Sequence, residues 1–228
     1  MKYFCLLIIL FLLISCDYNS SEDYFKEAVK LEKSGNFKRA ILFHNKALKI
    51  NPKSIASLIN RGSDKSELGD YHGAIIDLKS ILEFDRDNTL AHYAIGDTYS
   101  ELKEYTKAIK FYTKALQTKG IIKKPTIDTK KHSILFIIGN DQYSVQDYYI
   151  YFERGIAYLE TNQYDKAIID IKNSLLNENG ISDCYFLLGK CYLGKKDSIK
   201  ACNNFIESAK LGDKEAREMI KKHCLKNK

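Results

Sequence analysis

The sequence lacks a hydrophobic run long enough to cross a membrane. Its longest apolar stretch extends from Tyr3 to Ile14. A helix of that length rises about 18 Å, whereas the hydrocarbon core of a bilayer is about 30 Å thick. The sequence therefore predicts no permanent membrane span, and the short run needs another explanation.

The chain also lacks the motifs that usually carry catalysis. Its histidines are scattered, so there is no paired-histidine metal motif. Neither a glycine loop that would cradle phosphate nor a nucleophile elbow is present. We therefore expect a protein that is not an enzyme and that holds no cofactor and no metal.

A stripe of basic residues is missing too, although the formal net charge is +7. Lysines and arginines alternate with acids along the chain, which is typical of solvated helix faces rather than of a nucleic-acid surface. We expect no nucleic-acid partner. A basic binder of glycan or nucleic acid stays open as an alternative because of the charge balance and the 16 tyrosines.

The first residues have the order of an export signal: Lys2, the apolar run, the small Ser15 and then Cys16. The stretch from Leu13 to Cys16 resembles the lipobox of bacterial lipoproteins, in which the cysteine is lipidated and the bond before it is cut. The resemblance implies a signal peptide at 1–15, a lipidated tether at 16–21 and a lipid anchor in the outer membrane or the outer leaflet of the cytoplasmic membrane. The alternatives are an ordinary secretory signal and an uncleaved buried helix.

A period of 34 residues runs through the rest of the chain. It is visible in the segments GNFKRAILFHNKAL at 35, GDYHGAIIDLKSIL at 69 and KEYTKAIKFYTKAL at 103. After an interruption it returns in NQYDKAIIDIKNSL at 162 and KDSIKACNNFIESA at 196. Such a period is typical of stacked helical repeats. The units begin at about 21, 55, 89, 148 and 182.

These units resemble the tetratricopeptide repeat family, in which each unit is a pair of antiparallel helices. The resemblance implies an all-α, right-handed solenoid of about five helix-turn-helix units, with a small residue of the first helix facing a small one of the second. The family's small eighth position is matched by Ala28, Gly62, Gly96, Gly155 and Gly189, and its alanine at position twenty by Ala40, Ala74, Ala108, Ala167 and Ala201.

The organisation that follows is units one to three at 21–120, an insert at 121–147, units four and five at 148–212, and a capping helix at 213–228. In the insert, the run 133–138 before Gly139 predicts a short β-hairpin, and the next helix should begin near 145. The insert either carries binding specificity or covers an apolar seam. The last unit and the cap, which begins at Asp213, drift toward the Sel1-like pattern.

Two charge pairs recur at positions seven and twenty-three, Arg61 with Asp77 and Arg154 with Asp170. We predict that both are structural ion pairs between the two helices of a unit.

The turns within units contain Gly35, Gly69 and Asn162, which tolerate a left-handed backbone. Lys103 and Lys196 replace such residues in the other two units, so we expect looser turns there.

Four cysteines lie in the last fifth of the chain. Cys202 and Cys224 flank the Gly212 bend at similar distances, so antiparallel helices would bring their thiols together. Either a disulfide or two buried thiols would fit this arrangement. Cys184 and Cys191 are too far apart on one helix to bridge, and we interpret them as packing residues.

Tetratricopeptide proteins generally hold a peptide or a partner helix in a groove lined by their first helices. The resemblance implies a lipid-anchored protein-interaction adaptor of the bacterial cell envelope, or more specifically an assembly factor for an outer-membrane or secretion complex. It places these residues in the groove: Tyr93, Asp97, Glu101, Tyr149, Phe152, Ile156, Phe186 and Lys190. The insert would cover some of these aromatic residues under the alternative interpretation.

Overall fold

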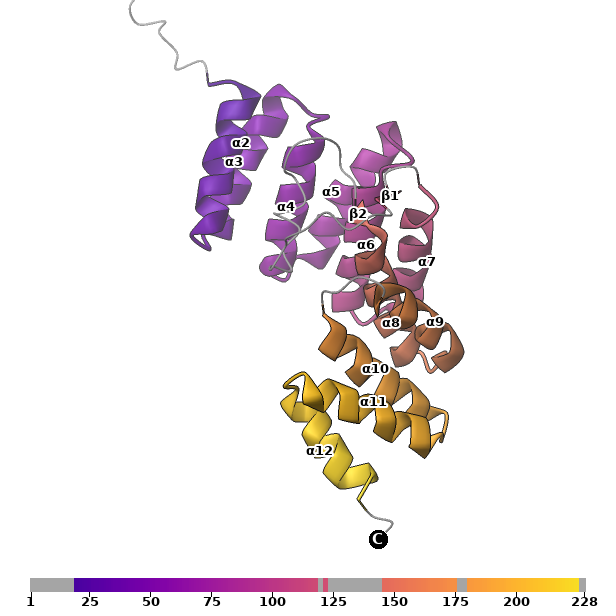
Figure 1. Ribbon diagram of the computed structural model, residues 1–228. Coiled ribbons are helices and arrows are strands. Elements are labelled where there is room, and N and C mark those ends of the chain that lie inside the picture. The colour runs from indigo at the N-terminus through magenta and orange to yellow at the C-terminus, as the bar shows by residue number, and fades with distance from the viewer. Residues whose placement is uncertain (1–18, 119–120, 123–144, 176–179, 226–228) are drawn as a thin grey trace, which may run out of the picture.

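The computed structural model describes residues 19–118, 121–122, 145–175 and 180–225 (Figure 1). The signal sequence and Cys16 lie outside this part of the chain. No helix of the described residues is long and apolar enough to cross a membrane. The helices are α2 Ser21–Lys33, α3 Phe37–Ile50, α4 Ile55–Glu67, α5 Tyr71–Phe84, α6 Thr89–Glu101, α7 Tyr105–Ala115, α8 Asp147–Glu160, α9 Tyr164–Leu175, α10 Ile181–Gly194, α11 Ser198–Lys210 and α12 Lys214–His223.

Consecutive helices form antiparallel pairs, from α2 with α3 to α10 with α11, and each pair packs on the next. Figure 1 shows these pairs following one another in chain order from indigo to yellow, with α12 lying against α11 at the end. The predicted all-α solenoid of five helix-turn-helix units with a capping helix is therefore confirmed.

Helix starts follow from capping side chains. Ser20 and Asp23 form a capping box at the start of α2, and Asn88 accepts a hydrogen bond from the Ala91 amide at the start of α6. Asp213 accepts from the amides at the start of α12, as predicted for the cap. Each such cap satisfies an amide that the helix itself leaves without a partner.

The five turns within units are alike, and the expectation of two looser turns is wrong. Lys103 and Lys196 adopt φ of 57° and 62°, close to the 58° of Asn162. In every unit the residue after the turn donates its amide to a carbonyl near the end of the first helix, at 2.8–2.9 Å. Packing of the helix pair imposes the turn and outweighs the modest cost of a left-handed lysine.

The glycines at the eighth position lie closest to large side chains four residues after the alanines, and Gly62 also approaches its alanine, at the Ala74 carbonyl. A Cβ atom added to Gly96 would lie 2.6 Å from the Tyr112 ring, and one added to Gly189 would lie 2.4 Å from the Phe205 ring. The expectation that small residues face each other therefore needs correction. Because Gly96 and Gly189 have no side chain, there is room for the rings of Tyr112 and Phe205, which lie four residues after the alanines of the second helices.

The flanks of the insert pair as two short parallel strands, β1 Ile121–Ile122 and β2 Val145–Gln146. The following helix, α8, begins at Asp147, two residues later than expected. The predicted hairpin at 133–141 and the Ser144 helix start lie outside the described residues.

The capping helix packs on α11 through Ala216, Met219, Ile220 and Cys224, together with the fully buried Phe205. Cys202 and Cys224 lie at bonding distance, with the two sulfur atoms 2.08 Å apart. Cys184 and Cys191 are free thiols buried between helices, and burial raises the pKa of Cys184 to about 11 and of Cys191 to about 12. They act as small apolar side chains.

Candidate functional site

Two ion pairs brace the helix pairs on either side of the insert. Arg154 donates to both Asp170 carboxylate oxygens at 2.7 and 2.9 Å, and to Thr113 at 3.0 Å. This ties unit four to α7 of unit three. The predicted function of Arg154 as a structural residue agrees with this geometry, because both partners lie inside the helix stack.

The second pair is built the same way two units earlier in the chain, in unit two. Arg61 donates to both oxygens of Asp77 at 2.6 and 2.8 Å, and to Asn45 at 2.6 Å. Asp77 has a second cation, since Lys65 lies 2.8 Å from it. The carboxylates of both pairs are at most 5% exposed.

Between these braces, α6, α7 and α8 bring together a set of polar side chains that we call the acid–tyrosine cluster: Tyr93, Asp97, Tyr112 and Glu153. The Tyr112 hydroxyl donates to Asp97 at 2.7 Å, and Tyr93 makes a second side-chain hydrogen bond to Asp97. The two tyrosine rings are 5.9 Å apart. Asp97 is thus held in place by two hydroxyl donors.

The carboxyl groups of this cluster are poorly hydrated. Burial, reinforced by Glu153, raises the pKa of Asp97 well above its usual range, although the two tyrosine hydrogen bonds oppose the shift. Burial and the nearby Glu101 raise the pKa of Glu153 to about 7. No lysine or arginine of the described residues forms an ion pair with these acids. A cation bound here would stabilise the ionised form of both carboxyl groups.

The predicted groove residues are placed unevenly. Tyr93 is only 8% exposed and packs in the core, so it is not an exposed anchor for a partner, which corrects that expectation. Phe152 packs against the apolar core formed by α8, α9 and α10, and the Phe186 ring lies 5.8 Å from the Phe205 ring. Asp97, Tyr149, Phe152, Ile156, Phe186 and Lys190 are half-buried, and Glu101 is exposed.

Lys190 belongs to a different place. It lines an open pocket of about 390 Å³ together with Leu159, Tyr164 and Met219, where α8, α10 and α12 approach one another. The sequence therefore grouped two separate surfaces: the acid–tyrosine cluster with Phe152 and Ile156, and this pocket near the capping helix.

Sequence reasoning missed Glu153, which lies on α8 one turn before Ala157. The sequence feature that could have identified it is a charged residue at the sixth position of unit four, where unit three has Ala94. It also missed a second group, Glu32, His44 and Asp64, whose ligand atoms lie within 4.8 Å of one another. That is the one such group among the described residues able to hold a metal ion.

Comparison with known proteins agrees with the fold. Residues 90–120 match the family model of the tetratricopeptide repeat. A TPR repeat-containing protein of Methanocaldococcus jannaschii is 22% identical over 76% of this chain, and human DnaJ homolog subfamily C member 7 is 29% identical over 45%. The chain spans only 33% and 23% of the lengths of these two relatives.

Solved structures resemble the chain over most of its length. MamA superimposes with a TM-score of 0.64 at 21% identity, covering 89% of this chain and 94% of that one. YrrB, described as a TPR protein with an unusual peptide-binding site, gives 0.65 at 17% identity over 88% and 91%. PilW, described as a type IV pilus biogenesis factor, gives 0.64 at 16% over 82% and 76%.

Fold, repeat spacing and family match together define the class: the chain carries a tetratricopeptide repeat at 90–120 and folds as a solenoid of the tetratricopeptide type. Such a solenoid supports binding of a protein or peptide partner.

Proposed function

We propose that this protein is a lipid-anchored adaptor of the bacterial cell envelope that binds a protein partner and carries out no chemistry. The observation that carries the proposal is the acid–tyrosine cluster on α6, α7 and α8. The carboxyl groups of Asp97 and Glu153 are poorly hydrated. Glu153 lies on α8 next to Phe152, whose side chain is half-buried. An extended segment with a lysine or arginine among apolar residues complements such a surface.

The short distance from Cys16 to the first helix is compatible with a lipid anchor. Helix α2 begins at Ser21, so the tether after Cys16 spans at most about 17 Å when fully extended. A lipid on Cys16 would therefore hold the first unit close to the membrane surface. Replacing Cys16 with serine should move the protein from the membrane fraction to the soluble fraction and abolish labelling with a radioactive fatty acid. Unchanged labelling in that variant would refute the anchor.

Partner binding is tested by photo-crosslinking in intact cells, with the probe at Phe152. A charge reversal, Glu153→Lys, should remove the crosslinked product, because it places a cation where the partner's cation would dock. The matched control is Glu83→Lys, an exposed glutamate on α5. A crosslinked product that persists in Glu153→Lys, or that maps to the protein's own insert, would overturn the proposed binding mode.

Binding should also depend on pH. The pKa of Glu153 is raised to about 7, so the carboxyl group loses its proton as the pH rises through that value. The affinity for a cationic partner peptide should therefore increase between pH 6 and pH 8. The variant Glu153→Gln should bind weakly and show a flat profile. An affinity that falls over this range would contradict the cation-binding role.

A second candidate function is assembly of an outer-membrane or secretion complex. The fold similarity to PilW, a pilus biogenesis factor, favours it. It would be supported if the crosslinked partner were a subunit of such a complex. The acidic character of the cluster disfavours the nucleic-acid alternative, because carboxylates repel phosphates.

A further inference from the structure

Three polar residues of the first two units occupy positions that later units give to apolar or uncharged side chains. His44 is at the twenty-fourth position, where the other units have the buried residues Leu78, Tyr112, Ile171 and Phe205. Glu32 and Asp64 are at the twelfth and tenth positions, equivalent to Leu159 and Cys191 in later units. The repeat itself therefore shows that packing alone does not require these three residues.

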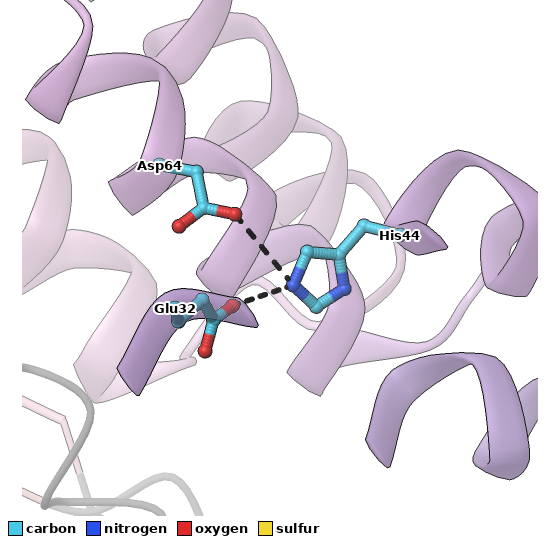
Figure 2. A group of neighbouring side chains, drawn as sticks. All are labelled: Glu32, His44 and Asp64. Carbon is cyan, nitrogen blue, oxygen red and sulfur yellow. Dashed lines mark hydrogen bonds and ion pairs between the residues drawn. The ribbon is translucent and has the colours of Figure 1, made fainter. Parts of the chain in front are cut away.

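Each residue comes from a different helix, and all three point to one place. Figure 2 shows the carboxylates of Glu32, on α2, and Asp64, on α4, directed at the same ring nitrogen of His44, on α3. His44 Nε2 lies 2.7 Å from Glu32 and 3.8 Å from Asp64. Asn60 donates to both oxygens of Glu32 at 3.2 and 3.3 Å, which fixes the orientation of that carboxylate.

The cluster is dry and incompletely satisfied. The side chains of Glu32 and His44 are 0% exposed, and that of Asp64 is 3% exposed. The Asp64 Oδ2 atom, which faces His44, has no hydrogen-bond partner among the described residues. Burial, with Glu32 and Glu67 nearby, raises the pKa of Asp64 to about 8. Among the described residues, the His44 imidazole is the one cationic group within ion-pair distance of the two buried carboxyl groups, and it can offset the charge of only one of them.

We propose that Glu32, His44 and Asp64 bind a divalent transition-metal ion, with zinc as the ion of best fit. One imidazole nitrogen and two carboxylate oxygens are ordinary zinc ligands at about 2.0–2.2 Å, which sets ligand atoms about 3.4 Å apart in a tetrahedron. The three ligand atoms already lie within 4.8 Å of one another, so small rotations of the side chains complete the site. A water molecule or a second carboxylate oxygen fills the fourth position.

Charge supports this assignment. Two ionised carboxylates and a neutral imidazole carry two negative charges, which a divalent ion cancels inside the core. In such a site, His44 Nε2 would coordinate the metal and Nδ1 would carry the proton. Nδ1 has no hydrogen-bond partner among the described residues, so this tautomer breaks no hydrogen bond of Nδ1. Asn60 supplies the outer hydrogen bonds that commonly orient a ligating carboxylate.

Such an ion would join three helices from two units. Helices α2 and α3 belong to the first unit, and α4 belongs to the second, so the metal would fix the first unit to the rest of the solenoid. The terminal unit of a repeat protein has a neighbour on one side only and is the least stabilised by stacking.

The test uses the full chain, stripped with a chelator and then titrated with zinc chloride by calorimetry. One zinc ion per chain is expected, together with a higher melting temperature. Cobalt chloride in place of zinc should give the visible absorption bands of a low-coordinate cobalt site. Asp64→Asn and His44→Leu should each lower the affinity at least about 100-fold, and Asn60→Ala should lower it about 10-fold.

Matched controls separate this site from other binding. Asp170→Asn and His92→Leu remove a buried acid and a buried histidine elsewhere and should leave zinc binding unchanged. Asp64→Asn preserves the shape of the side chain, and His44→Leu introduces the leucine that unit two has at this position. Far-UV circular dichroism verifies that both variants fold. Absence of zinc binding by the folded wild type, or equal affinity in folded Asp64→Asn, would overturn the proposal and leave a buried hydrogen-bonded cluster.

Discussion

The close approach of Gly96 to Tyr112 makes a quantitative prediction about helix pairing. A methyl group at Gly96 would lie 2.6 Å from two ring atoms of Tyr112, well inside van der Waals contact. The ring cannot move away easily, because it is fully buried, its hydroxyl donates a hydrogen bond to Asp97 and the Tyr93 ring lies 5.9 Å from it. The clash in Gly96→Ala must therefore be relieved by separating α6 from α7.

The magnitude follows from two opposing terms. Alanine in a helix interior is favoured over glycine by about 1 kcal/mol. Overpacking a close-packed core costs about 1–3 kcal/mol. The 2.6 Å contact with a ring that cannot move away places the cost in the upper part of that range, about 2–3 kcal/mol, so we expect Gly96→Ala to lose about 1–2 kcal/mol, or roughly 3–6 °C in melting temperature for a chain of this size. Gly62→Ala should stay near wild type, because its nearest neighbour, Leu78 Cγ, is 3.2 Å from the added Cβ and needs to shift by only a few tenths of an ångström.

The assay is thermal melting followed by circular dichroism, with a double-mutant cycle as its control. Tyr112→Leu gives unit three the residue that unit two has at this position, and should remove most of the penalty of Gly96→Ala. A coupling of about 1–3 kcal/mol is expected for residues in such contact. A Gly96→Ala protein that melts at or above the wild-type temperature, or a penalty of the same size in the Tyr112→Leu background, would refute the packing argument.

Two further predictions concern the braces of the solenoid. Arg154→Met should cost about 3 kcal/mol in unfolding free energy, because it strands a buried carboxylate, whereas Arg61→Met should cost clearly less because Lys65 still pairs with the same aspartate; equal losses in urea unfolding would contradict this. The bond between Cys202 and Cys224 closes 22 residues and should contribute roughly 3 kcal/mol. Peptide mapping of the unreduced protein should find the linked pair, and two separate thiol peptides would show that the bond is absent.

The sequence was sufficient for the helices because the repeat supplies the same evidence several times. The same helix boundaries are indicated by small residues at fixed spacing, by capping residues such as Asp213 and by turn residues such as Gly35. The turns at Lys103 and Lys196 were misjudged because local preference was weighed without packing. A left-handed lysine costs only about 1–2 kcal/mol, which the stacked helix pair outweighs.

The acid–tyrosine cluster was harder to predict for a reason of geometry. Its residues come from units three and four, which an insert of 27 residues by number, 121–147, separates in the sequence. Periodicity stops at the insert, so nothing in the spacing says that α8 packs on α6 and α7. The structure shows that it does, with the paired flanks β1 and β2 bringing the ends of the insert together.

The two acidic clusters are distinguished by what can reach them. Glu32 and Asp64 are almost fully enclosed by three helices, so only a small ion can compensate their charge without unstacking the units. Asp97 and Glu153 are half-buried, and the neighbouring Glu101 is exposed, so this cluster lies partly at the surface of the solenoid. The same physical demand, a cation for poorly hydrated carboxyl groups, therefore favours a metal ion in the first two units and a lysine or arginine of a partner in the middle of the solenoid. If zinc rather than a peptide bound at Glu153, or a peptide competed with zinc at Asp64, enclosure would not be the property that separates the two sites.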